Sequence, residues 1–136
     1  MPFDTEMVLH DGTTITLDIT PTSTSRTSGS AVLNIKKTGS NGLVAVLIMG
    51  ADLAEASDTF IVTIEESATA NGTYVELARF PTLTKGTGMP GTYMRRFTTD
   101  KAYIRALIDI NDSDGQADFT VADCYILLSQ YPFVDL

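Results

Sequence analysis

Apolar and polar side chains alternate over several short stretches of this chain. In residues 14–20, Ile15, Leu17 and Ile19 alternate with threonine and aspartate residues. Successive side chains of a strand point to opposite faces of a sheet, so a period of two predicts β-strands. Further stretches with strand-like patterns or composition occupy residues 31–37, 42–50, 59–66, 73–80, 91–98, 101–110 and 118–129.

The run GLVAVLIMG at residues 42–50 is apolar throughout and is bounded by glycines. It is short for a helix, so we expect a strand that is buried on both faces or lies at an interface. Helix-forming composition occurs only at residues 51–57, where Asp52 is a candidate cap for a single turn. About eight strands, closely spaced along the chain, predict an all-β protein that is either a sandwich or a barrel.

A chain of 136 residues fits one domain with a sizeable core. No apolar run approaches the roughly 20 residues that span a bilayer, and the N-terminus has no signal-peptide pattern, so we expect no membrane partner. The C-terminal sequence QYPFVDL is apolar where most tails are polar. This composition indicates either a partner surface or a segment that covers an open end of the fold.

The chain carries 17 acidic and 9 basic residues, for a net charge of −8. Binding to nucleic acid requires lysine and arginine side chains that neutralise phosphates, so we expect no nucleic-acid partner. A strand through Arg95 and Arg96 places their side chains on opposite faces. Solvation is the simplest role for the cations of the second half, followed by ion pairs with a neighbouring subunit or an acidic partner. These cations are Arg79, Arg95, Arg96, Lys101 and Arg105.

An aspartate-rich stretch at residues 106–128 suggests a calcium loop at first sight. Such a loop needs oxygen ligands at positions 1, 3 and 5, glycine at position 6 and glutamate at position 12. With Gly115 at position 6, Ile110 and Val121 fall at positions 1 and 12, and neither side chain can bind calcium. A loop that starts at Asp109 fails in the same way. We therefore expect no metal site. The aspartates are Asp109, Asp112, Asp114, Asp118 and Asp123.

The same stretch is better explained as a hairpin turn at residues 111–116 between two strands, because aspartate, asparagine and glycine suit tight turns. Asp109 and Asp123 would then lie on opposite strands and could face each other. A carboxylate pair for acid–base catalysis also needs a cleft with an apolar wall. We expect both carboxylates to lie on solvated faces instead.

Three other features are candidate chemical sites. His10 is the only histidine, so it forms no metal cluster, and we expect it at the surface. Cys124 lies among apolar residues, where a cysteine is usually an inert part of the core. The glycine-rich residues 86–91 lack the spacing of a phosphate-binding loop and predict a flexible connection. We assign no catalytic and no cofactor-binding residue, and we expect neither enzymatic activity nor a cofactor.

The second half of the chain carries a family resemblance. The segments EESATANGTYVELARFP and YMRRFTTDKAYIRALIDINDSDGQADFTVADCYILL resemble small accessory proteins of tailed-bacteriophage heads. Those proteins have an "ES.dG..y..l..f" strand pair followed by "yRr...t...YiRa...i.g......f.v...ll". The resemblance covers residues 59–128 and fits best the jelly-roll capsid decoration, or cement, proteins.

The resemblance implies a single jelly-roll-like antiparallel β-sandwich of about eight strands over residues 1–136, with residues 1–12 as an N-terminal arm and residues 130–136 as a C-terminal tail. The jelly roll consists of two sheets that share one core. Alternation would place on its inward faces Ile15, Leu17, Val32, Phe60, Val62, Ile64, Leu77, Ile104, Ala106, Ile108 and Ile126, or their neighbours one register away.

The resemblance also implies a function. The protein would decorate the outer surface of a virion, bind the major capsid protein, and associate with itself as a dimer or trimer. Residues 1–12, 20–30 and 82–92 are the expected capsid contacts. Two alternatives remain open: a carbohydrate- or receptor-binding module, for which Tyr74, Tyr93 and Tyr103 would supply the missing aromatic platform, and a head–tail or tail structural protein.

Overall fold

The computed structural model describes residues 8–12, 15–16, 33–35, 42–53, 59–86, 91–111 and 120–130. Within these ranges the chain forms strands and no helix, which confirms the predicted all-β class. It therefore contains, over that part of the chain, no helix that could cross a bilayer. The strands are β1 (Val8–Asp11), β2 (Ile15–Thr16), β3 (Leu33–Asn34), β4 (Leu43–Met49), β5 (Thr59–Ser67), β6 (Val75–Arg79), β7 (Leu83–Thr84), β8 (Gly91–Phe97), β9 (Tyr103–Asn111), β10 (Thr120–Val121) and β11 (Cys124–Gln130).

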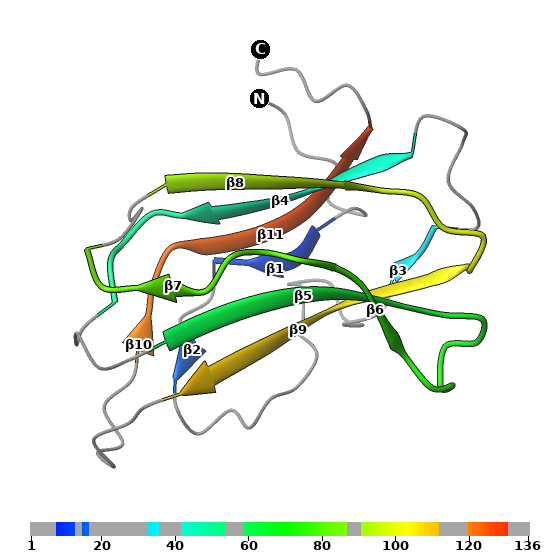
Figure 1. Cartoon of the computed structure of the whole chain (residues 1–136), viewed down its shortest axis with the longest axis horizontal. Helices are drawn as coiled ribbons and strands as arrows, with labels where there is room; N and C mark the ends of the chain where they lie inside the picture. Colours follow the sequence, from blue (N-terminus) through cyan, green and yellow to red (C-terminus); the bar gives the residue numbers. More distant parts are fainter. Residues whose placement is uncertain are drawn as a thin grey trace.

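Two antiparallel sheets lie face to face (Figure 1). The first sheet has the strand order β1-β11-β4-β8. The second sheet has the order β3-β9-β5-β6, and the short β7 pairs with β5 beyond the end of β6. The remaining strands, β2 and β10, form a separate two-stranded ladder.

The strand pairing is that of a jelly roll. Of the eight strands that make up the two sheet orders, the first pairs with the last (β1 with β11), the second with the seventh (β3 with β9), the third with the sixth (β4 with β8) and the fourth with the fifth (β5 with β6). A ribbon of four such pairs that rolls up into two sheets is the jelly-roll arrangement. The predicted fold is confirmed.

Both sheets contribute to one core. Leu9, Leu47 and Ile126 enter it from the first sheet, and Phe60 and Ile64 from the second. Each large aliphatic side chain buried in this way contributes roughly 1.5–3 kcal/mol. The expected inward positions that are buried are Phe60, Val62, Ile64, Ile104, Ala106, Ile108 and Ile126, and Leu77 packs partly buried against them. The expected positions Ile15, Leu17 and Val32 fall outside the residues whose side chains are described.

Strand β4 is buried on both faces, as its continuous apolar sequence predicts. Its alternate side chains enter the shared core, while Val44 and Val46 belong to a second apolar cluster on the opposite face with Leu127 of β11. Ile48 and Tyr125 pack against this second cluster. The expectation that the apolar excess of β4 and β11 is available to partners is therefore wrong for Val44, Val46 and Leu127, because these side chains are already buried within the chain.

Parts of two predicted contact segments belong to the sandwich itself. Residues 8–11 of the expected N-terminal arm form β1, which pairs with β11 and buries Leu9 completely. Within residues 82–92, β7 pairs with β5, and Leu83 is buried. Residues 8–11 and 83–84 each carry an apolar side chain that the core accommodates, which explains why these parts belong to the sandwich. Residues 1–7, 20–30, 87–90 and 131–136 lie outside the described residues.

Asp52 joins two connections instead of capping a helix. Residues 51–53 are not helical, and residues 54–58 lie outside the described part. The Asp52 carboxylate accepts a hydrogen bond from the backbone N–H of Leu53 at 2.8 Å and from that of Gly86 at 3.1 Å. The carboxylate therefore links the residues after β4 to the turn after β7, because two backbone donors from different segments converge on it.

Candidate functional site

The aspartate-rich stretch does not form the expected hairpin. Strand β9 pairs with β3 and β5 in the second sheet, whereas β11 pairs with β1 and β4 in the first. The chain between them therefore passes from one sheet to the other, and Asp109 does not face Asp123. Asp109 lies opposite Ile61 of β5. The jelly-roll order accounts for the difference, because it pairs β9 with strands that are distant in sequence.

Asp123 has a structural position at the start of β11. Its φ of 55° is in the left-handed region, which aspartate tolerates better than most residues. Its carbonyl accepts a hydrogen bond from the N–H of Gly50 at 2.9 Å. A Cβ at position 50 would lie 2.8 Å from the Asp123 Cβ, so glycine is required there. The described residues contain no group of three or more histidine, cysteine and acidic residues placed to hold a metal, and Asp112, Asp114 and Asp118 lie outside them.

His10 and Cys124 are both buried. The surface position expected for His10 is wrong, because the residue is in β1, opposite Ile126, and only 6% exposed. The inert core position expected for Cys124 is confirmed. Burial raises the pKa of the Cys124 thiol to about 12, so the thiolate that would act as a nucleophile is absent at neutral pH.

A polar cluster lies on the face of the second sheet that points away from the core. Arg105 of β9 is directly opposite Glu65 of β5, and its Nε donates to Glu65 Oε1 at 2.8 Å. The Arg105 guanidinium stacks on Tyr74, with Cζ 4.0 Å from the ring centroid. The Tyr74 hydroxyl donates to the carbonyl of Ala70 at 2.9 Å. The side chains of Arg105 and Glu65 are 30% and 12% exposed, so solvent screens this ion pair only partly.

Desolvation raises the pKa of the Tyr74 hydroxyl, and the nearby Arg105 charge opposes this rise. Tyr103 also contributes to the rise. It precedes Arg105 by two residues in β9 and therefore lies on the same face of the sheet. Tyr93 packs partly buried against the core from the first sheet. The structure thus brings together two of the three tyrosines considered as an aromatic platform and separates the third.

A group of cationic and apolar residues lies where β6 and β8 meet. We call it the β6–β8 edge and define it by Arg79, Phe80, Met94, Arg95 and Arg96. The Arg95 side chain spans the two strands: Nε donates to the Arg79 carbonyl at 3.1 Å and Nη1 to the Met94 carbonyl at 2.9 Å. Its Cζ lies 5.9 Å from the centre of the Phe80 ring. These contacts hold the guanidinium in one orientation at the open edge of the sandwich.

The predicted opposite orientations of Arg95 and Arg96 are confirmed by the register of β8 on β4. Arg95 lies opposite Ala45, which faces the core, and Arg96 lies opposite Val44, which belongs to the second apolar cluster on the other face of the sheet. Side chains directly opposite each other share a face of the sheet.

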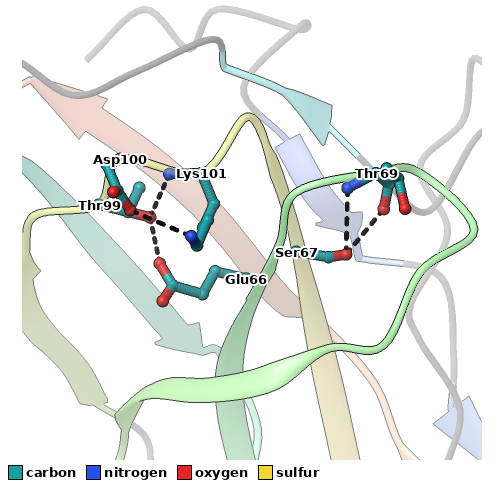
Figure 2. Close-up of polar contacts among 6 residues, drawn as sticks. All are labelled: Glu66, Ser67, Thr69, Thr99, Asp100 and Lys101. Atoms are coloured by element: carbon teal, nitrogen blue, oxygen red, sulfur yellow. Dashed lines mark hydrogen bonds and ion pairs between the residues drawn. The ribbon is translucent and has the colours of Figure 1, made fainter.

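Other cations have carboxylate partners within the chain. Arg79 Nη2 lies 2.9 Å from Glu76 Oε1, and Lys101 Nζ lies 3.7 Å from Asp100 Oδ1. Figure 2 shows Lys101 in the β8–β9 connection, where its backbone N–H donates to the Thr99 hydroxyl.

The close-up in Figure 2 also shows how polar contacts organise one end of the second sheet. The Thr99 hydroxyl donates to Glu66 Oε2 and so ties the β8–β9 connection to β5. The Ser67 hydroxyl donates to the Thr69 carbonyl at 2.8 Å and accepts from the Thr69 N–H at 3.3 Å. These bonds satisfy the turn after β5 locally, and we assign them a structural role.

Sequence reasoning missed two of these arrangements. The contact of Glu65 with Arg105 joins residues 40 positions apart, and the contact of Arg95 with Phe80 joins two different sheets. Only the period of two, which places Glu65 and Arg105 on outward positions, hinted at the first. Comparison with known proteins adds no family: the sequence matches no protein-family model and no curated protein.

Proposed function

We propose that this protein is a virion structural protein that decorates an icosahedral phage capsid and stabilises it by bridging major capsid subunits. The observation that carries the proposal is the strand order, β1-β11-β4-β8 over β3-β9-β5-β6. This is the jelly roll that the resemblance of residues 59–128 to capsid decoration proteins implies. Agreement between a fold derived from strand pairing and a fold implied by sequence motifs supports the family assignment.

The proposed mechanism is passive and involves no reaction. Copies of the protein associate as dimers or trimers on the outer surface of the shell, and each copy contacts adjacent capsid subunits. A stable protein interface buries roughly 1,200–2,000 Å² in total, and many interfaces of this size act together on one shell. The net charge of −8 disfavours binding to the packaged DNA and so favours the outer surface.

A binding experiment with capsids tests this function. Purified protein is mixed with capsids that lack it, the capsids are pelleted, and bound copies are counted per shell. The proposal predicts saturation at a copy number set by icosahedral symmetry and a higher melting temperature of the decorated shell. Absence of co-sedimentation with capsids of the cognate phage would refute it.

The self-association is tested separately by sedimentation equilibrium of the free and the capsid-released protein. A dimer or trimer in either preparation supports that part of the proposal. A monomer in both would leave the capsid binding in place and remove the self-association.

One observation favours a second candidate function, a carbohydrate-binding module. Tyr74 and Tyr103 lie on the same outer face of the second sheet beside Arg105, and aromatic rings with a nearby charged donor suit recognition of a sugar. A glycan array decides between the two functions. Strong binding that is lost in Tyr103→Ala would favour the carbohydrate-binding function, and an array without signal would remove it.

A further inference from the structure

We infer that the β6–β8 edge is a docking surface for an acidic, extended segment of a partner protein, with Arg95 as its anchor. The recognition would consist of a carboxylate of the segment bound by the Arg95 guanidinium and a neighbouring aliphatic side chain of the segment packed on Met94, at the opposite face of β8. The identification of that partner as a major capsid subunit rests on the proposed function, whereas the chemistry of the edge does not.

Arg95 carries a positive charge without a carboxylate partner among the described residues of an acidic protein. Arg79, Lys101 and Arg105 each lie within ion-pair distance of a carboxylate of this chain. Arg95 is exposed, and within the described ranges it contacts only backbone carbonyls and an aromatic ring. Its positive charge is therefore available to a carboxylate from outside the chain, although the chain carries 17 acidic residues.

The guanidinium of Arg95 is oriented in advance. Two hydrogen bonds and the Phe80 ring hold its guanidinium, so little side-chain entropy is lost when a carboxylate binds. Nη2 makes no hydrogen bond to the described residues and remains a donor for the incoming oxygen. Arginine is one of the residue types enriched among the hot spots of protein interfaces.

Met94 supplies an exposed apolar side chain at the same edge. It is 46% exposed and directly precedes Arg95 in β8, so the two side chains point to opposite faces of the strand. Met94 lies opposite Val46 of β4, whereas Arg95 lies opposite Ala45. The side chains of an extended segment also alternate between faces, so a segment that alternates carboxylates with aliphatic side chains complements both Arg95 and Met94.

The backbone of β8 restricts how the segment binds. Strand β8 pairs with β4 over its whole length and has no strand partner on its other side within the described ranges. An edge strand of this kind can receive an added strand, but the Met94 carbonyl already accepts a bond from Arg95. We therefore assign recognition to side chains along the edge and not to a complete backbone ladder.

A peptide titration tests the chemistry without capsids. The probe is a synthetic peptide of alternating glutamate and valine with blocked ends, and the matched control peptide has glutamine in place of glutamate. The full-length protein, labelled with ¹⁵N, is titrated with each peptide. The inference predicts that the glutamate peptide shifts the amide signals of β8 and β6 and that the glutamine peptide does not. No shift, equal shifts with both peptides, or shifts confined to the Tyr74–Arg105 face would overturn it.

Variants then test the anchor. Arg95→Gln is expected to weaken binding of the glutamate peptide about tenfold, because it removes a charge-assisted hydrogen bond. Arg95→Lys, which keeps the charge but loses the fork of donors, is expected to give an intermediate loss. Lys101→Gln removes the same charge from the β8–β9 connection and is the matched control, with unchanged binding. Equal losses in Arg95→Gln and Lys101→Gln would refute a specific role for Arg95, and thermal melts verify that each variant is folded.

The same variants in the capsid assay separate the two proposals. If wild-type protein binds capsids and Arg95→Gln binds about tenfold more weakly, both the function and the docking edge are supported. If Arg95→Gln decorates capsids as well as the wild type does, the edge is not the capsid contact and the proposed function stands. If the wild type does not bind capsids, the proposed function fails, and the peptide titration alone decides the inference.

Discussion

Val46 offers a direct test of the finding that β4 is buried on both faces. Its side chain is 0% exposed, lies opposite Leu127 of β11, and belongs to the second cluster, away from the core between the sheets. Threonine has nearly the same shape as valine but adds a hydroxyl. Burying a hydroxyl without a full hydrogen-bond partner costs about 1–3 kcal/mol in proteins, so Val46→Thr should lower the free energy of unfolding by about that amount.

Urea denaturation followed by circular dichroism measures this change. With a urea dependence of about 1–3 kcal/mol per molar, the midpoint should fall by about 1 M. Val75→Thr is the matched control, because it makes the same substitution at a β6 position that is 55% exposed, and its effect should stay within about 0.5 kcal/mol. If Val46→Thr were as stable as the wild type, the second cluster would be open to water in solution, and β4 would be buried on its core face alone.

The remaining predictions concern glycines, the cysteine and the ion pair. Gly86→Ala should lower the free energy of unfolding by about 1 kcal/mol through the strain of its φ of +77° alone, because nothing lies near the added Cβ. Gly42→Ala should lower it clearly more, because its Cβ would lie 2.3 Å from the Phe97 carbonyl oxygen. Urea denaturation ranks the two variants, and equal losses would contradict the packing at Gly42. Burial raises the pKa of the Cys124 thiol from 9.0 to about 12, so the thiol of the unfolded chain ionises first as the pH rises. Between these two pKa values, the free energy of unfolding should fall by about 1.4 kcal/mol per pH unit. Urea midpoints between pH 8 and pH 10 should therefore fall less in Cys124→Ala than in the wild type, and parallel slopes would show that the thiol is not buried. Arg105→Met should cost about 1.5–3 kcal/mol in thermal unfolding, because it leaves the carboxylate of Glu65 without its cation; a neutral effect would mean that this pair is fully solvated.

The predictions that depended on one strand at a time were accurate. The inward positions Phe60, Val62 and Ile64 of β5, and Ile104 and Ile108 of β9, are all buried. Whether a side chain faces the core follows from its own character and from the period of two along its strand. The outward positions of Glu65 and Arg105 followed in the same way from the period of two. The contacts that those polar positions make were not visible.

The predictions that depended on which strands pair were less accurate. A hairpin through Asp109 and Asp123 is the prediction for two strand-like segments that a turn sequence separates. In the jelly roll, β9 instead pairs with β5, which lies about 40 residues earlier, and β11 pairs with β1 and β4. The burial of His10 depends on strand pairing in the same way, since β1 is a strand only because β11 lies beside it.

By itself, the sequence determined that this chain forms short β-strands, which of their faces are apolar, and that its charge is strongly acidic. These properties are local or additive, and each residue contributes to them wherever its strand lies. Only the tertiary structure decided that Arg105 stacks on Tyr74 beside Glu65 and that Arg95 reaches across the β6–β8 edge to Phe80. Such contacts depend on long-range strand pairing, whose free energy comes from the core shared by two sheets and not from any one segment of the chain.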